Sequence, residues 1–476
     1  MLVKRLSRAK HIMATIDKRK LIILLISLCV VSAVTMIYFT FDNSMTGKQQ
    51  QKKKSPMLQV QNSGLRVELV TEGLSSPTSI DFVDNNNILV LEKDGLVRLI
   101  SNGVLQKHPA LKVPVNTTSE RGLLGIAILN GSNSSNSGGD GSGDTSHTKY
   151  TNITKTGAAA AATANKATKT ANVFLYFTES KLNEPLRNRI YKYAWDGKSL
   201  FNSTLILDLP AEPGPNHDGG KLKIGPDHYL YAVIGDLNEG DSVLQNYKNG
   251  KPPHDSSVIL RINPNNGSPA KNNPFSRNGN NADNNALARY YAYGIRNSFG
   301  MAFDPITGTL WDTENGPTMY DEINLVKPGF NSGWQELMGP ISRSHVSEKD
   351  MINLPGSKYA DPVFSWFPPI GVTAIEFLKS SKLGKEYENN IFVGDINNGN
   401  LYYFKLNKTR NGLKFDNSLA SESGLLSDSV ADDKSEISAI TFGTGFGGIT
   451  DIDTGPDGLL YILSYGNGSI YRVVPR

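Results

Sequence analysis

Three segments of the chain hold side chains that could carry out chemistry, and the first contains an acid–base pair. His217 opens the run 217–222, and Asp236 follows the apolar run Leu230–Ile234. A histidine before one strand and an aspartate after the next can approach each other in a hairpin of this length. A carboxylate that fixes a neutral imidazole makes a general base near physiological pH. The alternative is a loop histidine without a chemical role.

The second segment, Tyr293–Gly300, places Arg296 and Asn297 at the end of an expected strand. An arginine at a strand end can stabilise a developing anion or bind a carboxylate. An ordinary salt bridge would use the same residue type, so the segment alone leaves both interpretations open.

The third segment runs from Glu314 to Trp334 and combines acidic residues with a Gly-Pro turn. Carboxylates beside the carbonyls of Gly316 and Pro317 are suitable oxygen ligands for Ca²⁺. Asp321 and Glu322 are the acidic residues that follow this turn. Acidic turns also occur simply because they are soluble, so a metal site and a solvated turn both remain possible here.

Short β-type runs separated by Gly, Asn, Asp and Pro must position these segments, because no long helical periodicity follows residue 64. Six similar strands are expected at Ile88–Glu92, Phe174–Thr178, Leu230–Ile234, Leu310–Thr313, Ile391–Gly394 and Leu460–Leu463. Their expected partners are Leu96–Ile100, Arg189–Ala194, Val258–Ile262, Glu322–Val326, Leu401–Leu406 and Ile470–Val474.

The strand pairs recur roughly every 45 to 80 residues, which is typical of the blades of a β-propeller. We therefore expect an all-β, six-bladed propeller over residues 63–476, with a β-sandwich as the alternative. Leu65–Val70 should complete the last blade beside the C-terminal strands. Residues 130–171 are rich in Ser, Gly and Asn and then in Ala, Thr and Lys. This low-complexity stretch is expected to be a mobile surface insertion.

The N-terminal region is expected to anchor the protein in a membrane. Leu21–Phe41 has no charged side chain, and its 21 residues would span about 31 Å as a helix. The basic tail 1–20 predicts a cytoplasmic N-terminus and places the rest of the chain outside the cell. A cleaved signal peptide is the alternative. Residues 42–62 are polar and are interpreted as a linker.

Composition excludes several classes of protein. The chain has 476 residues, 38% hydrophobic and 20% charged, with a single cysteine. The apolar fraction excludes a wholly disordered chain, and one cysteine excludes a disulfide scaffold. The net charge of +4 lies largely in the N-terminal tail, and no basic run in the body predicts nucleic-acid binding.

In order, these segments resemble the soluble glucose dehydrogenases that depend on pyrroloquinoline quinone (PQQ), also called glucose/sorbosone or aldose sugar dehydrogenases. The resemblance covers roughly residues 64–476 and agrees with the repeat count, since the family fold is a six-bladed propeller. The motifs that carry it are Leu74–Pro77 with Leu89–Glu92, Gly122–Gly125, the His217 segment, Leu260–Asn263, Gly294–Asn297, Glu314–Trp334 and Gly455–Gly458.

The resemblance implies a role for each candidate residue. His217 would take a proton from the anomeric hydroxyl of a sugar, and Asp236 would orient it. Arg296, with Asn297 beside it, would stabilise charge on the reduced cofactor. Calcium held by Gly316 and Pro317 would polarise the quinone, with Asp321 and Glu322 at acidic positions associated with calcium in the family. Three further positions resemble the wall of the cofactor pocket: Glu120, Trp366 and Thr373.

The sequence departs from the family where cations meet the cofactor carboxylates. A lysine of the family is replaced by Asn397, and two arginines are replaced by Gly448 and Thr450. A glutamine of the family corresponds to Glu120. Each lost charged hydrogen bond would cost roughly 1–3 kcal/mol of cofactor binding.

Two functions from different classes follow. One is a membrane-anchored, extracytoplasmic quinoprotein dehydrogenase that uses PQQ and Ca²⁺ to oxidise an aldose to its lactone and passes electrons to an unknown acceptor. The other is a non-catalytic propeller that binds glycan or protein and has lost its cofactor. Turnover with PQQ and Ca²⁺ would distinguish them.

Overall fold

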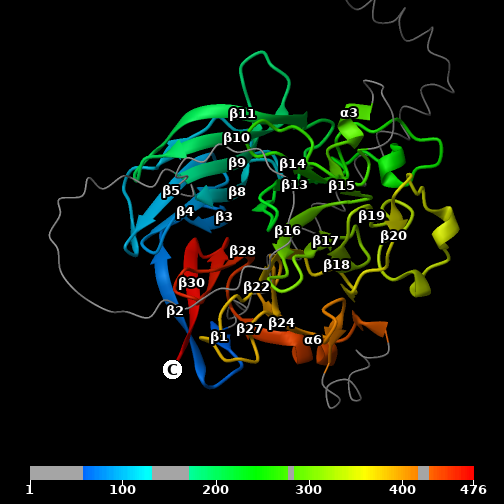
Figure 1. Ribbon diagram of the computed structural model, residues 1–476. Coiled ribbons are helices and arrows are strands. Elements are labelled where there is room, and N and C mark those ends of the chain that lie inside the picture. Colours follow the sequence, from blue (N-terminus) through cyan, green and yellow to red (C-terminus); the bar gives the residue numbers. More distant parts are fainter. Residues whose placement is uncertain (1–56, 131–170, 277–283, 416–427) are drawn as a thin grey trace, which may run out of the picture. The chain divides into compact units, whose positions relative to one another are not determined.

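The computed structural model describes residues 57–130, 171–276, 284–415 and 428–476, all within one compact unit. Nearly all regular elements of this unit are strands, and they form six sheets of four to six strands each (Figure 1). The prediction of an all-β propeller is confirmed.

The first three sheets carry the N-terminal half of the unit. The first holds β3 (Pro77–Phe82), β4 (Asn87–Glu92), β5 (Leu96–Ser101), β6 (Val104–Leu105) and β7 (Leu111–Lys112). The second holds β8 (Leu123–Asn130), β9 (Ala171–Glu179), β10 (Arg187–Trp195) and β11 (Leu200–Pro210). The third holds β12 (Leu222–Ile224), β13 (Leu230–Ile234), β14 (Val258–Ile262), β15 (Tyr290–Tyr293), β19 (Phe330–Asn331) and β20 (Lys358–Tyr359).

The other three sheets complete the unit. The fourth holds β16 (Ser298–Phe303), β17 (Leu310–Asn315), β18 (Asp321–Val326), β21 (Phe364–Trp366) and β26 (Val430–Ala431). The fifth holds β22 (Val372–Phe377), β23 (Ile391–Asp395), β24 (Leu401–Leu406), β25 (Leu413–Lys414), β27 (Thr441–Thr444) and β1 (Gln59–Val60). The sixth holds β28 (Ile449–Thr454), β29 (Leu460–Ser464), β30 (Ser469–Pro475) and β2 (Leu65–Glu72). Short helices are η1 (Val243–Gln245), α3 (Asn284–Leu287), η2 (Ile341–Arg343), η3 (Glu348–Asp350) and α6 (Lys434–Ile440).

The six strands expected from the repeat are the second strands of the six sheets, and each pairs with its expected partner. Every residue of β13 and of β29 is buried, because these strands have a neighbour on each edge and a packed layer on each face. Such strands become continuous apolar runs rather than alternating ones.

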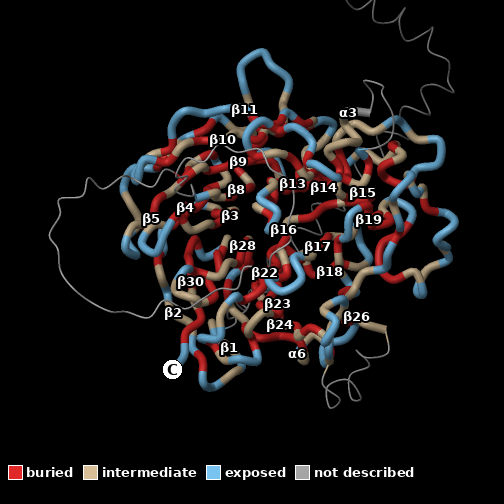
Figure 2. Tube along the Cα trace, in the orientation of Figure 1, coloured by how far each residue is buried: buried red, intermediate tan, exposed pale blue. Residues whose placement is uncertain are grey.

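The innermost strands of the sheets contact one another in a closed cycle. The cycle runs β3, β8, β12, β16, β22 and β28, and β28 returns to β3. Figure 1 shows these strands around a common centre, and Figure 2 shows buried residues along them and exposed residues on the outer loops. Apolar side chains fill the spaces between sheets, so the ring covers sheet faces that would otherwise be exposed.

The two ends of the described chain close the ring. Strand β2 pairs with β30 in antiparallel register, from Leu65 opposite Pro475 to Glu72 opposite Ser469. This pairing confirms that Leu65–Val70 completes the sheet of the C-terminal strands. Between the sixth and first sheets, the Ser79 hydroxyl donates to Asp451 Oδ2 at 2.6 Å.

Two predicted segments lie outside the described residues, wholly or almost wholly. The low-complexity stretch connects neighbouring strands, because β8 ends at Asn130, β9 begins at Ala171, and these residues pair. Both residues belong to strands, so the predicted boundaries of the insertion were too wide by one residue at each end. The predicted span Leu21–Phe41 also lies outside. Within the described ranges, no helix has the length and apolar character needed to cross a membrane.

Candidate functional site

His217 and Asp236 are in direct contact, as the spacing of their segments predicted. His217 Nδ1 lies 2.5 Å from Asp236 Oδ1, and the histidine side chain is only 12% exposed. The Asn238 amide also donates to Asp236 Oδ1, at 2.9 Å. The indole Nε1 of Trp334 donates to Asp236 Oδ2 at 2.7 Å. A carboxylate fixed on both oxygens favours the tautomer with the proton on Nδ1, which leaves Nε2 free to accept a proton.

The backbone around this pair is strained and closely packed. His217 has φ of 65°, a left-handed conformation that costs a non-glycine residue about 1–3 kcal/mol. Its N–H donates to Glu120 Oε2 at 2.6 Å. A Cβ at Gly235 would lie 2.5 Å from the His217 carbonyl oxygen and 2.4 Å from that of Arg296. Only glycine at position 235 allows the three segments to meet so closely.

Glu120 joins the histidine segment to the arginine segment. Its Oε2 accepts both the His217 amide and, at 3.0 Å, Asn297 Nδ2. Glu120 also lines the cavity described below. The carboxylate therefore orders two functional loops, in addition to the cofactor contact that the resemblance implies.

Arg296 lies between β15 and β16, and its guanidinium contacts Asn315 and Trp334. Its Nη1 donates to the Asn315 carbonyl oxygen at 2.8 Å, and its Cζ lies 5.3 Å from the centre of the Trp334 ring. Its carbonyl oxygen accepts the Asp236 amide at 2.9 Å. Burial lowers the pKa of the guanidinium, against the opposing charges of Asp236 and Glu314. Arg296 Nε is buried without a hydrogen-bond partner among the described residues.

A buried acidic cluster lies behind Arg296 on β17 and β18. It consists of Asp312, Glu314 and Glu322, each no more than 1% exposed. Burial raises the pKa of Asp312 and of Glu314 to about 8, and the carboxylates raise one another further. Burial also raises the pKa of Glu322 well above its ordinary value. Glu314 Oε1 accepts the Arg296 amide at 2.6 Å, which links the cluster to the site.

Asp321 performs a structural task in addition to the one that the resemblance implies. Its Oδ2 accepts the amides of Ile370, Gly371 and Val372 at 2.7 to 3.0 Å. Its Oδ1 accepts the Gly316 amide at 3.1 Å. Both oxygens are occupied, so Asp321 fixes the Gly316–Pro317 turn against β22. Glu322 is one of the three carboxylates of the buried acidic cluster described above.

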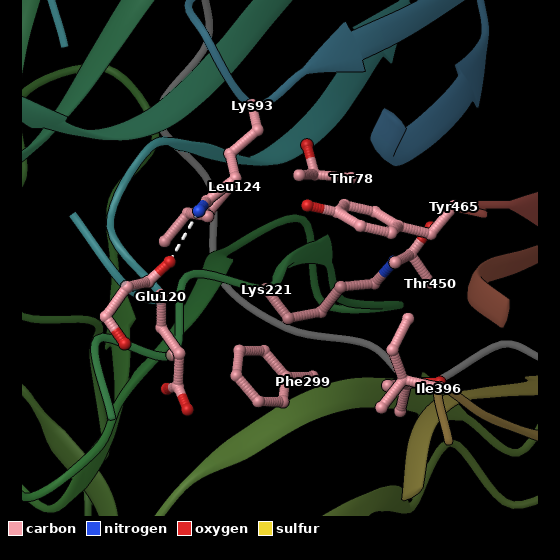
Figure 3. A pocket seen from close by; sticks show the side chains of 12 residues that line it. Thr78, Lys93, Glu120, Leu124, Lys221, Phe299, Ile396, Thr450 and Tyr465 are labelled. Carbon is pink, nitrogen blue, oxygen red and sulfur yellow. Dashed lines mark hydrogen bonds between the residues drawn. The ribbon is translucent and has the colours of Figure 1, made fainter. Parts of the chain in front are cut away.

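A cavity of about 320 Å³ opens beside the His217 and Arg296 segments. Figure 3 shows its lining side chains, which come from several sheets. The wall includes Glu120, Thr373 and Thr450, two lysines, Lys93 and Lys221, and apolar side chains such as Phe299 and Ile396.

Trp366 is not part of this wall, which corrects the expectation that it lines the pocket. It is fully buried in β21, where its ring packs on Phe364 at 4.9 Å and on Phe404 at 5.8 Å between centres. Thr373 does line the cavity, but its single hydroxyl hydrogen is shared between the carbonyl oxygens of Ile449 and Gly394, at 2.6 and 3.0 Å.

The three positions where the family carries cations lie on one side of the cavity. Thr450 is in the wall, and its hydroxyl donates to the Pro77 carbonyl oxygen at 2.8 Å. Asn397 is exposed and lies against Gly371, while its neighbour Ile396 lines the cavity. A Cβ at Gly448 would meet the Ile396 carbonyl oxygen at 2.8 Å. These three positions therefore bring no charge to this side of the cavity.

Asp218, next to His217, gives the site a pH-dependent stability. Burial raises its pKa to about 6, and Asn188 and Arg121 oppose this only in part. The stability supplied by the neutral form is complete below pH 4 and is lost as the pH rises through 6. We expect Asp218→Asn to remove about 3 kcal/mol of the change in unfolding free energy between pH 4 and 7. Urea unfolding of both proteins at the two pH values measures this, and equal pH dependence would contradict it.

Comparisons with known proteins find relatives in sequence and in fold. The sequence model described as Glucose / Sorbosone dehydrogenase matches residues 146–472. An uncharacterised protein of Synechocystis is 26% identical over 438 residues, which cover 88% of each chain. The aldose sugar dehydrogenase YliI of Escherichia coli is 26% identical over 275 residues, covering 57% of this chain and 64% of that one. The PQQ-bound form of an aldose sugar dehydrogenase from Streptomyces coelicolor shares the fold, with a TM-score of 0.57 at 20% identity, over 87% of this chain and 99% of the other.

Proposed function

Because the chain belongs to the glucose/sorbosone dehydrogenase family, we propose that it is a membrane-anchored, extracytoplasmic quinoprotein that oxidises an aldose at C1 to the lactone. The observation that carries this proposal is the His217–Asp236 pair, with Arg296 beside it, which Glu120 of the cavity wall contacts through the His217 amide. The sugar substrate is supported by the E. coli relative, which is named an aldose sugar dehydrogenase, and the Streptomyces structure shows PQQ bound to a protein of the same fold. We count the six sheets as six blades around this site.

The residues around the cavity fit a planar quinone cofactor. The volume of about 320 Å³ has room for a tricyclic ring system beside Phe299. Arg296 Nε and Asn297 Oδ1 are both buried without hydrogen-bond partners in the described ranges, and the wall residue Glu120 contacts Asn297 Nδ2 at 3.0 Å. We propose that Arg296, Asn297, Glu120 and Thr373 surround the cofactor, which when bound supplies the acceptor for the hydride of C1.

The chain's own side chains would handle the proton and the charge. His217 Nε2 accepts the proton of the anomeric hydroxyl, and Asp236 stabilises the imidazolium that forms. Trp334 donates a hydrogen bond to Asp236 Oδ2, and its ring lies against the Arg296 guanidinium. The same tryptophan therefore positions both the acid–base pair and the anion-stabilising arginine. Loss of one proton and one hydride converts the hemiacetal carbon to the lactone carbonyl.

We propose that Ca²⁺ binds at the Gly316–Pro317 turn, where oxygen ligands are available. The carbonyls of Gly316 and Pro317 and the carboxylate of Glu322 are hard oxygen ligands of the type that Ca²⁺ prefers. Asp312, Glu314 and Glu322 have pKa values raised by burial, and a divalent ion nearby would favour their charged forms. Asp321 remains part of the proposal beside Glu322; the oxygens of both carboxylates accept hydrogen bonds that Ca²⁺ would have to replace in part.

The neutral cation positions favour a second candidate function. A tricarboxylate cofactor would meet no charge at Asn397, Gly448 or Thr450. A propeller that binds glycan or protein without a cofactor has no need of charges at these positions. The membrane location in either case rests on the basic tail and on Leu21–Phe41, and the electron acceptor is unknown.

Dye reduction distinguishes the two functions. The full chain in detergent, loaded with PQQ and Ca²⁺, is expected to reduce an artificial electron acceptor when aldoses are added. Removal of Ca²⁺ with a chelator should abolish the rate, and Ca²⁺ but not Mg²⁺ should restore it, because the oxygen-rich site suits the larger ion. No turnover at saturating PQQ with any aldose would favour the binding module.

A further inference from the structure

We propose that Lys93 and Lys221 together hold the carboxylates of the anionic cofactor in this chain, in place of the absent C-terminal cations. The inference rests on the proposed quinoprotein function. It assigns the charged contacts with the cofactor to residues other than those that carry cations in the family. Lys93, directly after β4, and Lys221, directly before β12, both line the cavity.

Lys221 brings a charge to the side of the cavity that Thr450 lines. Its side chain is only 6% exposed, and its Nζ donates to Asp451 Oδ1 at 2.5 Å. Asp451 follows Thr450, a position where the family has an arginine, and Figure 3 shows the Lys221 side chain extending toward Thr450. Lys221 therefore brings a positive charge close to residue 450, the position at which the family has an arginine.

The Lys221 ammonium still has hydrogens to donate. An ammonium carries three N–H donors, and Asp451 is its one hydrogen-bond partner among the described residues. Asp451 is itself committed elsewhere, because its Oδ2 accepts the Ser79 hydroxyl and the Ile80 amide. The ion pair fixes the ammonium at the wall without exhausting its donors.

Lys93 supplies a second charge that no carboxylate offsets in the described structure. Its Nζ donates to the carbonyl oxygens of Thr117 and Ser119, at 3.2 and 2.5 Å. Two N–H groups are used in this way, and the third remains for a ligand. Figure 3 shows Lys93 and Lys221 extending in different directions from separate segments of the cavity wall, as two contacts at separated points of one ligand require.

These two lysines suit a planar ligand with at least two carboxylates, such as PQQ. Charge-assisted hydrogen bonds to carboxylates are stronger than neutral ones, and they weaken with salt where the groups are partly exposed. Asp451 and Glu120 offset part of the positive charge, so we expect weaker and more salt-sensitive binding than three uncompensated cations would give.

Binding, measured without turnover, tests this inference. The full chain in detergent with Ca²⁺ is titrated with PQQ, and quenching of tryptophan fluorescence gives Kd. We expect Lys93→Gln and Lys221→Gln each to raise Kd about tenfold to a hundredfold and to reduce its salt dependence. Lys93→Arg should keep most of the affinity. Lys112→Gln, which removes an exposed lysine of β7 in the same sheet as Lys93, is the matched control.

The outcomes separate the inference from the proposed function. Wild-type Kd values in both glutamine variants would overturn the role of the lysines and leave the quinoprotein function standing. No binding of PQQ to the wild type would overturn both. If Lys221→Gln fails to fold because Asp451 is left unpaired, Lys221→Gln combined with Asp451→Asn removes both charges, and a wild-type Kd there would overturn the role of Lys221.

Discussion

His217→Ala is expected to lower kcat for aldose oxidation by about a thousandfold, because a positioned general base contributes roughly 10² to 10⁴. The imidazole is fixed by Asp236 at 2.5 Å and is the only histidine of the described residues in contact with that carboxylate. Steady-state dye reduction at saturating PQQ and Ca²⁺ measures the change. PQQ binding should stay within about twofold of wild type, since the ring is not required to hold the cofactor.

The chain offers a closely matched control for this variant. His228 is exposed in the turn after Gly225 and has φ of 63°, against 65° for His217. His228→Ala therefore removes the same side chain from the same backbone conformation away from the cavity. Its kcat should equal that of wild type. A His217→Ala rate within tenfold of wild type would refute the assignment of the base.

Trp366→Ala should lower the free energy of unfolding by about 3–5 kcal/mol, the usual cost of removing a large buried ring. Trp366 packs on Phe364, Tyr402 and Phe404 at ring-centre distances of 4.9 to 5.8 Å. Trp366→Phe should cost less than about 1.5 kcal/mol, partly because the buried Nε1 has no partner to lose within the described residues. Denaturant unfolding measures both.

Measurements of kcat distinguish Trp366 from Trp334, which hydrogen-bonds to Asp236 in the candidate site. Trp366→Phe should leave kcat and the Kd for PQQ within about twofold of wild type. Trp334→Phe, the matched change, removes the hydrogen bond to Asp236 Oδ2 and should lower kcat with little loss of stability. A large fall in PQQ affinity for Trp366→Phe would restore Trp366 to the cavity wall.

The fold was predictable because its signal is local and repeated. Runs such as Leu230–Ile234 combine continuous apolar character with a turn residue at each end, and the structure makes each of them the second strand of a sheet. The His217–Asp236 contact could be predicted for the same reason, since the two residues flank adjacent strands of one sheet.

Other parts of the site depend on contacts that no local pattern specifies. Trp334 reaches Asp236 across 98 positions of the chain, and Lys221 reaches Asp451 across 230. Trp366 was misplaced because β21 has only three residues, all buried, and so gives no alternation that would tell a cavity-facing side chain from a core one. Asp321 was assigned by residue type, whereas its backbone partners become neighbours only when β22 docks.

The pairing of β2 with β30 also has a consequence for how the protein is made. The two strands are separated by almost the whole ring, from Glu72 to Ser469. At a synthesis rate of about 5–20 residues per second, the first strand emerges roughly 20 to 80 seconds before its partner exists. During that interval the edge of β2 that pairs with β30 has no partner on the nascent chain, and the ring closes only after β30 has left the ribosome and docked.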